Sequence, residues 1–593
     1  MSSAEAAQDQ AKSTRGGARD ANRAWMRALE MTSRLGKEPH RLLASVVDEW
    51  ADRQPDTPAL LSDAETLTYD QLARQARRYG RWALAQGLGK GEVVALMAPN
   101  RPDYLAAWLG VSSIGGVVAL LNTNLRGAAL SHCLAVAEPR HLLLADEFAD
   151  CAAVAEEGVK VWRINDLDLA GYADAPLTDA ERRETRLGDP ALLIYTSGTT
   201  GLPKAARVSH HRVMSWAGWF AGLLDASPED RLYDCLPMYH SVGGVVATGA
   251  LLVKGGSVVL REKFSASRFW DDVVRWDCTL FQYIGELCRY LAAAPVSPNE
   301  TAHRLRMVCG NGLRPDVWTA FQARFAIPRI LEFYAATEGN FSLYNVEGEP
   351  GAIGRVPPFM AQRFPAAIVR HDVATGAPLR GEDGFCQRCE AGEPGEAIGR
   401  LAAAGDPAHR FEGYTSRAES EKKILRDVFE VGDAWLRTGD LMRTDERGFY
   451  YFVDRVGDTF RWKGENVATT EVAEALSECP GVVEATVYGV AVPGADGKAG
   501  MAALVVEDGF DLTGLRQRLA ERLPAYAQPV FLRLVSSLAV TETFKQKKAD
   551  LAKEGFDPAV VADPLYVASP GQEGYERLDL DMCERIVAGR IRL

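Results

Sequence analysis

The chain carries the loop Thr196-Ser197-Gly198-Thr199-Thr200-Gly201-Leu202-Pro203-Lys204 directly after the short apolar run 191–195. The run is predicted to be a buried strand, because it is short, apolar and bounded by Pro190 and the loop. Glycines let the backbone turn tightly, while hydroxyl groups, backbone N–H groups and one Lys side chain can surround the oxygens of a polyphosphate. A plain surface turn is the alternative, and the strand and Lys204 make it the weaker one. The sequence therefore predicts a phosphate site at a strand end.

This loop differs from the GxxxxGK[ST] phosphate loop. Counting from Gly198, the second glycine of that pattern would fall on Pro203, and Ala205 stands where a Ser or Thr would hold magnesium. The identity of the nucleotide site therefore depends on other motifs.

Three further motifs follow along the chain. They are Tyr334-Ala335-Ala336-Thr337-Glu338-Gly339-Asn340, Thr438-Gly439-Asp440 and Asp454-Arg455-Val456-Gly457-Asp458. In their order and spacing the four motifs resemble the adenylate-forming superfamily of acyl-CoA synthetases, luciferases and peptide-synthetase adenylation domains. Four ordered matches are far more specific than any one of them alone.

Finer matches narrow this resemblance to one branch. Three more stretches are similar to the fatty acid transport proteins, which are the very-long-chain acyl-CoA synthetases: Asn122–Arg126, Gly310-Asn311-Gly312-Leu313-Arg314-Pro315-Asp316 and Gly457–Val467. The similarity extends from about Leu42 to about Tyr566, which is nearly the whole chain.

Composition excludes several classes of protein. Hydrophobic residues make up 47% and charged residues 25% of the 593 residues, a balance typical of globular proteins with large cores. The formal net charge of −13 argues against nucleic-acid binding, although it leaves room for a local basic patch. Of ten cysteines only Cys386 and Cys389 are closely paired, which is weak support for a zinc site. The lack of a recognisable signal peptide leads us to expect a cytoplasmic protein, with peripheral membrane contact and homodimerisation left open.

Residues 104–121 contain no charged side chain, which meets a crude threshold for a membrane-spanning helix. The pair Gly115-Gly116 interrupts this run and would suit a helix end before a strand at 117–121. A buried helix, turn and strand therefore explain the run without a membrane.

From about Leu42, helical patterns alternate with short apolar runs. Strands are predicted at 93–97, 117–121, 141–145, 191–196, 258–260 and 307–309. This alternation predicts an α/β fold of mostly parallel βαβ sheets. Frequent glycines between about 385 and 448 indicate a smaller β-rich subdomain.

Three domains are expected. Residues 1–40 are a partly disordered N-terminal arm, in which residues 25–35 form a helix that either packs on the fold or touches a membrane or partner. Residues 41–454 are the large AMP-binding (adenylation) domain. Residues 455–593 are a small α+β domain with a helix at 471–478, a strand pair within 482–492 and a basic amphipathic helix at 512–523. The resemblance implies that this small domain rotates between two half-reactions.

A thioester forms from a carboxylate only after a leaving group has been attached. The resemblance implies that ATP supplies it, with Mg²⁺ on the phosphates and CoA as the final acyl acceptor. Thr196, Ser197, Gly198, Thr199, Thr200, Gly201 and Lys204 would hold the β- and γ-phosphates. Catalysis is expected of Thr196, Lys204, His240, Glu338 and Lys545.

The resemblance also implies the remaining contacts. Glu338 would bind Mg²⁺, Thr337 would lie near the α-phosphate, and Tyr334 and Ala335 would flank adenine. Gly310, Asn311 and Gly312 would let the backbone lie against the base, unless they form a plain turn. Asp440 would accept the ribose hydroxyls, and Arg455 would pair with the ribose and mark the hinge. Gly457 stands where many relatives have Asp or Lys, and this puts the exact pivot in doubt.

Two assignments compete with simpler interpretations. His240 would lie at the wall of the carboxylate pocket, but a core histidine fits almost as well. Lys545 would contact the carboxylate and the α-phosphate, but its neighbours Lys547 and Lys548 also fit a solvated basic face. Phe544 stands where the superfamily usually has Gly, as it does in the fatty acid transport branch.

The sequence predicts a fatty acyl-CoA synthetase that converts ATP, a long- or very-long-chain fatty acid and CoA into acyl-CoA, AMP and pyrophosphate. One alternative is the same reaction on another hydrophobic acid, such as a bile acid or sterol side chain. A fatty acid transport or binding protein and a ligase that loads a carrier protein are more distant alternatives. The aromatic residues between 216 and 290 could line an acyl tunnel or belong to the core.

Overall fold

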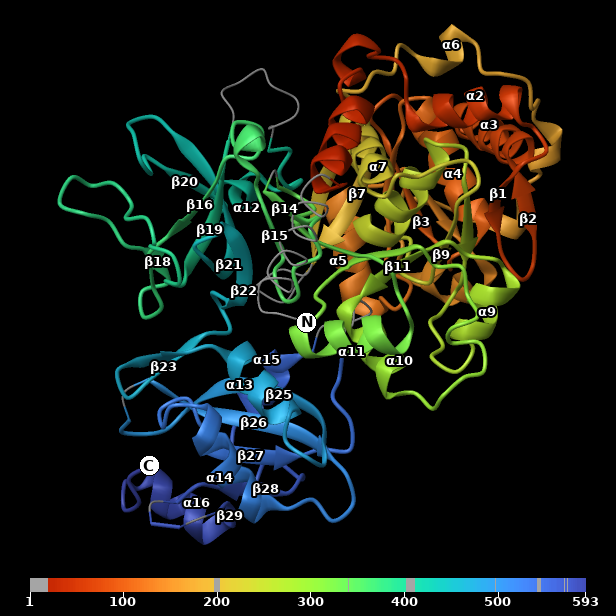
Figure 1. The fold of residues 1–593 in the computed structure, drawn as a ribbon. Helices are drawn as coiled ribbons and strands as arrows, with labels where there is room; N and C mark the ends of the chain where they lie inside the picture. The colour runs from red at the N-terminus through yellow and green to blue at the C-terminus, as the bar shows by residue number, and fades with distance from the viewer. Residues whose placement is uncertain are drawn as a thin grey trace, which may run out of the picture. The chain divides into compact units, whose positions relative to one another are not determined.

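The computed structural model describes residues 20–196, 203–339, 341–401, 411–495, 497–540, 546–569, 571–572 and 574–593. The chain forms two compact units, which Figure 1 shows in ribbon form. The large unit extends to Phe364 and also includes Arg400–Leu425. The small unit consists of Pro365–Gly399 and Arg426–Leu593. These limits describe which residues pack together. The predicted domains 41–454 and 455–593 concern which part rotates, and they stay a prediction.

The large unit contains an eight-stranded sheet whose six central strands are parallel. An antiparallel strand closes each edge. In spatial order the strands are β14 (Ser342–Asn345), β13 (Ile330–Ala335), β12 (Met307–Asn311), β11 (Leu280–Ile284), β9 (Arg231–Asp234), β10 (Ser257–Leu260), β1 (Pro58–Leu61) and β2 (Thr66–Thr68).

A six-stranded sheet forms the rest of the framework of this unit. Five of its strands are parallel and β8 is antiparallel. In order they are β6 (Lys160–Arg163), β5 (His141–Leu144), β3 (Val93–Met97), β4 (Val117–Leu120), β7 (Pro190–Thr196) and β8 (Lys204–Ser209). The six strands predicted from apolar runs are all present: four of them in this sheet, as β3, β4, β5 and β7, and two in the eight-stranded sheet, as β10 and β12. The predicted α/β class is therefore confirmed.

The inner strands of the six-stranded sheet are buried on both faces, as parallel strands usually are. In β3, Val94 and Leu96 belong to the main hydrophobic cluster, which also includes α2, α3, α4, α7 and α8. Ala95 and Met97 belong to a second cluster with Leu134 of α5 on the other face. Successive side chains of β3 point to opposite faces of the sheet, so this apolar strand packs against helices on both faces.

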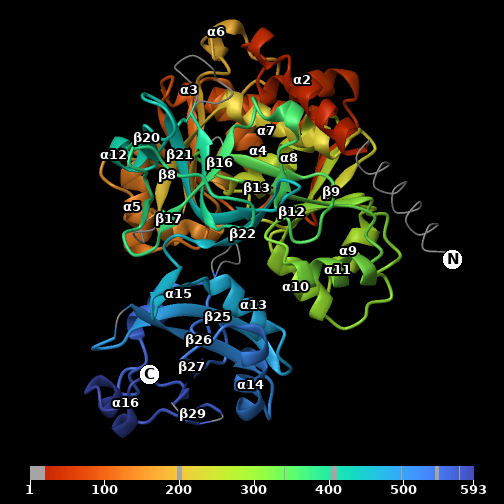
Figure 2. The ribbon, with the colours of Figure 1, turned by 60° about the vertical axis from the view of Figure 1, so that its left-hand side comes forward.

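The helices of the large unit are α2 (Leu43–Arg53), α3 (Tyr69–Ala85), α4 (Pro102–Ser113), α5 (Gly127–Ala137), α6 (Asp179–Arg182), α7 (His210–Leu223), α8 (Thr248–Leu252), α9 (Phe269–Arg275), α10 (Gly285–Ala293), α11 (Pro315–Arg324) and α12 (Arg417–Glu421). Of these, α10 and α11 pack against each other (Figure 2). Short segments complete the unit: η1 (Leu35–Lys37), η2 (Asp146–Val154), η3 (Ile164–Asp166), η4 (Leu169–Gly171), the π-helical η5 (Val242–Ala247), β15 (Gly354–Arg355) and η6 (Pro358–Met360).

The uncharged run at 104–121 forms a helix, a turn and a strand, as predicted. Helix α4 is almost completely buried, and β4 follows it after Gly115, which has a φ of +82°. A Cβ atom at Gly110 would lie 2.1 Å from the Ala76 carbonyl oxygen, so α3 and α4 approach closely there. Among the described residues, no helix is long and apolar enough to cross a membrane.

The N-terminal helix, residues 20–32, packs onto the large unit. Trp25 is 1% exposed, and its ring lies 5.8 Å from that of Trp219 and 5.7 Å from that of Tyr344. A Cβ atom at Gly222 would lie 2.5 Å from the Ala28 Cα atom, so only glycine allows this approach. Of the two interpretations of this helix, these contacts support the packing one.

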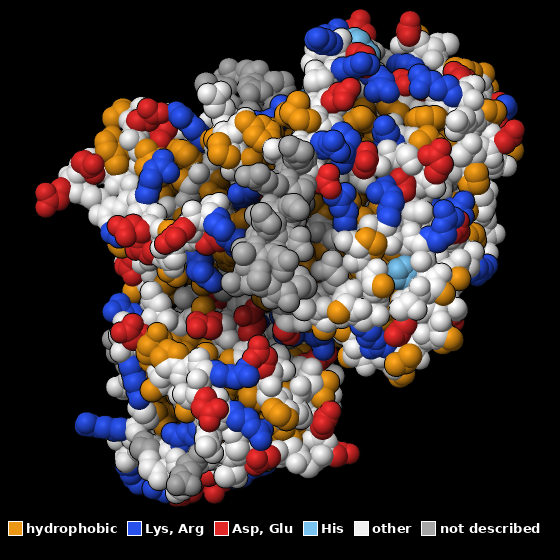
Figure 3. Space-filling view, in the orientation of Figure 1, with side chains coloured by type: hydrophobic (Ala, Val, Ile, Leu, Met, Phe, Trp, Pro, Cys, Tyr) orange, Lys and Arg blue, Asp and Glu red, His pale blue; other side chains and the backbone are white. Residues whose placement is uncertain are grey.

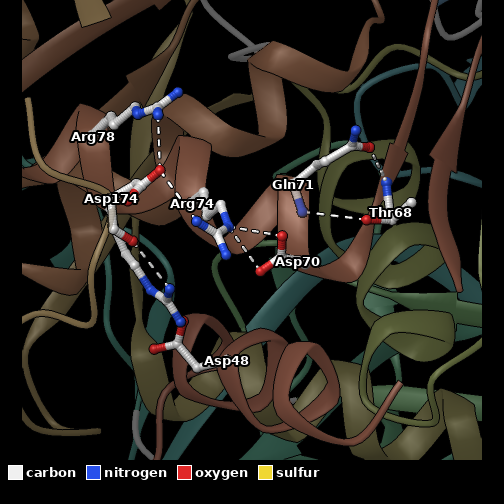
Figure 4. Close-up of polar contacts among 8 residues, drawn as sticks. Asp48, Thr68, Asp70, Gln71, Arg74, Arg78 and Asp174 are labelled. Atoms are coloured by element: carbon white, nitrogen blue, oxygen red, sulfur yellow. Dashed lines mark hydrogen bonds and ion pairs between the residues drawn. The ribbon is translucent and has the colours of Figure 1, made fainter. Parts of the chain in front are cut away.

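Arginines on α3 bind residues 173–176 through hydrogen bonds. The helix begins with a reciprocal cap between Thr68 and Gln71, and Arg78 then donates to Asp174 at 2.8 Å (Figure 4). Arg81 donates to the Ala173 and Ala175 carbonyl oxygens, both at 2.7 Å. Basic and acidic side chains are likewise interspersed over this unit in Figure 3. These arginines are therefore partnered within the fold.

The small unit begins with a β-rich part. Strands β22 (Phe449–Arg455), β21 (Ala434–Thr444), β19 (Gly395–Arg400) and β16 (Ala366–Val369) lie in this order in one sheet, which confirms the expected β-rich subdomain. Shorter strands are β17 (His371–Asp372), β18 (Ala377–Pro378) and β20 (Ile424–Arg426). Cys386 and Cys389 are free thiols here, and burial raises the pKa of both. No three metal-binding side chains cluster anywhere in the described part of the chain.

The C-terminal α+β module has its own hydrophobic core. Its central sheet has the order β25 (Val482–Ala491), β26 (Lys498–Val506), β27 (Phe531–Leu534), β28 (Leu565–Val567) and β29 (Glu576–Arg577). Around it lie β23 (Phe460–Trp462), β24 (Glu465–Val467), α13 (Thr469–Ser477), α14 (Leu512–Arg522), α15 (Lys548–Glu554) and α16 (Leu580–Val587).

The strand pair predicted within 482–492 is wrong, because this run is the single strand β25 and its partner is β26. Gly489 lies within this strand. A Cβ atom there would lie 2.7 Å from the Phe460 ring, so glycine makes room for that ring in mid-strand. The helices predicted at 471–478 and 512–523 are present as α13 and α14.

Candidate active site

Several predicted site residues follow the carboxyl ends of neighbouring parallel strands. His240 comes after β9, Gly312 after β12, and Thr337 and Glu338 after β13. Parallel strands place their carboxyl ends at one edge of the sheet, and ligands of open α/β sheets bind there. The topology therefore brings residues almost 100 positions apart to one edge.

The segment that carries His240 is tightly fixed. Asn100 Nδ2 donates to the Leu236 carbonyl oxygen at 2.7 Å and to that of Arg261 at 3.0 Å, and Asn100 Oδ1 accepts from Met238 N at 2.9 Å. A Cβ atom at Gly244 would lie 1.8 Å from the Met238 carbonyl oxygen, where η5 packs on this turn. Such π-helical turns are rare and often occur at functional sites. His240 lies half-buried against Tyr239 within this turn.

Asn100→Ala is expected to lower the free energy of unfolding by about 2–4 kcal/mol, because two buried carbonyl groups and one N–H group lose their partner. Urea unfolding followed by tryptophan fluorescence measures this loss. Asn165→Ala, which removes a hydrogen bond from the exposed Asn165 to Asp146, is the matched control. A loss below about 1 kcal/mol for Asn100→Ala would contradict the role of Asn100 as a clamp.

Thr337 and Glu338 are held by side chains from three other segments. Ser241 and Thr337 share a hydrogen bond between their hydroxyl oxygens at 3.1 Å, and Arg212 of α7 donates to the Thr337 carbonyl oxygen at 2.8 Å. The Tyr414 hydroxyl donates to Glu338 Oε1 at 2.7 Å. Lys423 Nζ lies 3.6 Å from the same oxygen. The Glu338 carboxylate is thus 9% exposed and faces both a hydroxyl and an ammonium group.

Lys204 shares the neighbour Tyr414 with Glu338. Strands β7 and β8 pair so that Thr196 is opposite Lys204, and Ser197, Gly198, Thr199, Thr200 and Gly201 lie outside the described residues. The Lys204 ammonium pairs with Glu419 and lies 5.8 Å from the centre of the Tyr414 ring. Tyr414 therefore contacts both Lys204 and Glu338.

Backbone pairing explains why Tyr414 is there. Thr415 N donates to the Ala205 carbonyl oxygen, and Arg207 N donates to that of Gly413, both at 3.0 Å. Residues 413–415 thus pair with β8 through one antiparallel β-bridge. Burial of Tyr414, together with the neighbouring Glu338 carboxylate, raises the pKa of the Tyr414 hydroxyl, so this group stays protonated and can donate a hydrogen bond.

The predicted adenine loop is fixed by the buried carboxyl group of Glu332. Glu332 Oε1 accepts from Gly312 N and from Leu313 N, and Glu332 Oε2 accepts from the Tyr283 hydroxyl at 2.5 Å. A Cβ atom at Gly310 would lie 2.3 Å from the Tyr283 carbonyl oxygen, and Gly312 has a φ of +80°. Both positions therefore require glycine.

Other predicted residues of this loop lie close by. Asn311 is the last residue of β12, and its Oδ1 atom is buried without a hydrogen-bond partner in the described part of the chain. Tyr334 and Ala335 end β13, and the Tyr334 ring lies 5.6 Å from that of Phe341.

Burial raises the pKa of Glu332 to about 8, against 4.5 for an ordinary Glu side chain. Between these values the folded protein holds a proton that the unfolded chain releases, so the contribution of Glu332 to stability is fully present below pH 4.5 and is lost as the pH rises to about 8. We expect Glu332→Gln to remove this slope, which is at most about 1.4 kcal/mol per pH unit for one proton. Thermal unfolding between pH 5 and 8 measures it.

Glu300→Gln is the control for this titration, because Arg324 lowers the pKa of Glu300 and keeps that side chain ionised throughout the range. An unchanged pH slope in Glu332→Gln would show that Glu332 titrates normally.

Asp440 and Arg455 come together within the small unit. They are Cα partners on β21 and β22, and Arg455 Nε lies 3.9 Å from Asp440 Oδ1. Asp454, 1% exposed, accepts hydrogen bonds from Thr459 Oγ1 at 3.1 Å and from Thr469 Oγ1 at 3.0 Å. The expected hinge is therefore anchored at Asp454.

Lys545 lies outside the described residues. Its neighbour Lys548 is a structural residue rather than part of a solvated face, since its Nζ atom donates to Thr469 Oγ1 at 2.7 Å and lies 3.2 Å from Asp458 Oδ2. Lys547 is exposed.

Seven residues of the site escaped the sequence analysis: Asn100, Arg212, Ser241, Glu332, Tyr414, Glu419 and Lys423. Only Glu332 carried a usable signal, because it interrupts an otherwise apolar strand and a buried charge requires partners. The others act through contacts far apart in the sequence.

Comparisons with known proteins identify the family of this chain. A family model described as "AMP-binding enzyme" matches residues 47–396, and another described as "AMP-binding enzyme C-terminal domain" matches residues 471–545. Long-chain fatty acid transport protein 1 of Mus musculus is 42% identical over 92% of this chain and 87% of its own length. The medium/long-chain-fatty-acid–CoA ligase FadD6 of Mycobacterium tuberculosis is 40% identical over 92% of this chain and 91% of its own length.

Solved structures agree with this result. The crystal structure of ATP-bound MatB from Rhodopseudomonas palustris has a TM-score of 0.74 and 26% identity, and the match covers 86% of this chain and 98% of that one. A Mycobacterium tuberculosis fatty acyl CoA synthetase, at 22% identity and a TM-score of 0.62, shares the fold. The chain belongs to the AMP-binding enzyme family.

Proposed function

We propose that this protein is an ATP-dependent fatty acyl-CoA synthetase for long- or very-long-chain fatty acids. The observation that carries the proposal is the arrangement around Tyr414. Its ring lies 5.8 Å from the Lys204 ammonium group, which suits phosphate, and its hydroxyl donates to the Glu338 carboxylate, which suits a cation. The curated relatives described above support the substrate class, since they are named for long-chain fatty acids.

The reaction has two steps. A fatty acid carboxylate oxygen attacks the α-phosphorus of ATP, the bond from this phosphorus to the bridging oxygen breaks, and pyrophosphate leaves. The sulfur atom of CoA then attacks the acyl carbonyl carbon, its proton goes to solvent, and AMP leaves. Pyrophosphate and AMP are both stable anions and therefore good leaving groups. The first step uses ATP to attach AMP to the carboxylate, and this gives the second step a group that can leave.

The donor set fits Mg²⁺ carried in by the nucleotide. Glu338 provides a carboxylate and Thr337 a hydroxyl group, and Mg²⁺ is usually held by one or two carboxylates together with substrate phosphates. The ion would neutralise charge on the triphosphate. Lys204 and the loop 196–204 would hold the β- and γ-phosphates, with Thr337 close to the α-phosphate.

The remaining roles are those that the resemblance to adenylate-forming enzymes implies. Gly310, Asn311 and Gly312 would form one side of the adenine site, with Tyr334 and Ala335 on the other. Asp440 would accept the ribose hydroxyls and Arg455 would pair with the ribose. His240, on its fixed turn, would meet the fatty acid carboxylate. Lys545 would neutralise charge during the first step, after which a rotation of residues 455–593 would admit CoA.

The aromatic residues between 216 and 290 largely pack on one another. Phe269 lies 5.1 Å from Tyr233 and 4.6 Å from Phe281, ring centre to ring centre, and all three are buried. This arrangement supports core packing more than a tunnel lining, so chain length has to be measured.

The test is pyrophosphate release from ATP across saturated acids of C8 to C26, with and without CoA. We expect release that depends on the acid, acyl-CoA that appears only with CoA, and highest kcat/KM for chains of C16 or longer. A bile acid serves as the competing substrate. Release without any dependence on fatty acid, or a preference for the bile acid, would contradict the proposal.

A further inference from the structure

The segment from Tyr414 to Lys423 supplies ionic partners for two charged groups of the proposed nucleotide site, Lys204 and Glu338. It belongs to the large unit and contains the short helix α12. Glu419 of this helix pairs with Lys204, and Lys423 lies 3.6 Å from Glu338. The two groups that would bind phosphate and Mg²⁺ thus have protein partners of the same charge as those ligands.

These contacts are specific ones. Glu419 is held by Lys204 and by Lys422, and the hydrogen bond from Lys204 is the main cause that lowers the pKa of Glu419 to about 2. The side chains of Lys204 and Glu419 are only 18% and 21% exposed, and those of Lys423 and Glu338 only 26% and 11%. By contrast, Lys422, which pairs with the other carboxylate oxygen of Glu419, is 67% exposed.

Unpaired charges at such positions would be costly. A charged group with little solvent around it is less stable without a partner, so the buried Glu338 and the partly exposed Lys204 both gain from partners whenever nucleotide is absent. Bound MgATP offers them better partners, namely phosphate oxygens for the ammonium group and a divalent cation for the carboxylate. One short segment therefore fills two requirements that the ligand later takes over.

We propose that Glu419 and Lys423 are stand-ins for MgATP, which are displaced from Lys204 and Glu338 when the nucleotide binds. Glu419 takes the place of triphosphate oxygens and Lys423 that of the metal ion. Tyr414 keeps its hydrogen bond to Glu338 and positions the carboxylate in both states. The inference rests on the proposed function, because it takes Lys204 and Glu338 as nucleotide ligands.

The exchange predicts an unusual direction of change. Residues that hold nucleotide weaken its binding when they are removed, and so do residues that merely support the fold. A stand-in competes with the nucleotide, so its removal strengthens binding. Glu419→Gln keeps the shape and helix propensity of the side chain but removes the charge that competes with phosphate.

The experiment is titration calorimetry of MgATP into the full-length protein without fatty acid. We expect Glu419→Gln to bind MgATP about 3- to 10-fold more tightly than the wild type, which is a modest value because the pair is partly solvent-exposed. Lys422→Met is the matched control, since it removes the other partner of Glu419 and leaves Lys204 paired. The control should bind as the wild type does.

A second arm tests the cation site. The Mg²⁺ concentration for half-maximal ATP binding should fall about 3- to 10-fold in Lys423→Met, because the metal ion no longer competes with an ammonium group for Glu338. Melting temperatures of all variants establish that they are folded. Unchanged or weaker MgATP binding by a folded Glu419→Gln would overturn the stand-in role, whereas a wild-type protein that binds no MgATP would contradict the proposed function itself.

Discussion

Glu338→Ala is expected to lower fatty acid-dependent pyrophosphate release by about 10²-fold or more, the cost of losing stabilisation of transition-state charge. The carboxylate is 9% exposed, accepts a hydrogen bond from Tyr414 and lies beside Lys423, so its removal leaves a cation where a cation-binding group is needed. Pyrophosphate release at saturating ATP and acid, over a range of Mg²⁺ concentrations, measures the effect. More Mg²⁺ should restore little activity.

The control has to separate lost chemistry from an unpaired basic partner. Glu347 is half-buried and pairs with Arg355 Nε at 2.7 Å. Glu347→Ala therefore also leaves a cation without its carboxylate, and it should stay within a factor of about three of the wild-type rate if only Glu338 carries the chemistry. Activity of Glu338→Ala within that same factor would contradict its assignment.

Local patterns in the sequence were enough for most of the framework. The run 93–97 is apolar at every position, and a strand buried on both faces has to be so, because Val94 and Ala95 serve opposite helical layers. Gly115 ends α4 with a positive φ that glycine adopts easily, so the same two glycines that argued against a membrane helix also located the turn.

The single strand β25 stands where a strand pair was predicted, and its Gly489 shows what a glycine leaves open in a sequence. Glycine allows a turn, but it also allows close approach of another group, and sequence shows only that a side chain is absent. At Gly489 the neighbour is the ring of Phe460, almost 30 residues earlier, so the local pattern could not tell the two apart.

The charged partners of the site could not be predicted for a related reason. Lys204 and Glu338 were recognisable because family motifs surround them, whereas Tyr414 reaches Glu338 only because residues 413–415 pair with β8. Asn100 joins the ends of β9 and β10 in the same way. Such contacts result from strand order, which the alternation of apolar runs leaves open.

Lys545→Ala is expected to lose about 10²-fold in acyl-adenylate formation and to retain nearly normal conversion of supplied acyl-adenylate to acyl-CoA. The proposed cation neutralises charge that gathers between the carboxylate and the α-phosphate, and this charge exists only in the first step. Two rapid-quench assays, one for each half-reaction, measure the split. The neighbouring lysines are suitable controls because their environments differ: Lys547 is exposed, and Lys548 bridges Asp458 and Thr469.

The controls separate a wrong register from a wrong mechanism. Lys547→Ala should leave both half-reactions intact. Lys548→Ala should lower the melting temperature and slow both half-reactions together, because it removes a bond that ties α15 to α13 next to the buried Asp454. If one of these two variants instead lost adenylation alone, the catalytic lysine would be assigned to the wrong position while the mechanism stood. Equal loss of both steps in Lys545→Ala would contradict the mechanism, because a cation needed only for the first step cannot slow the second.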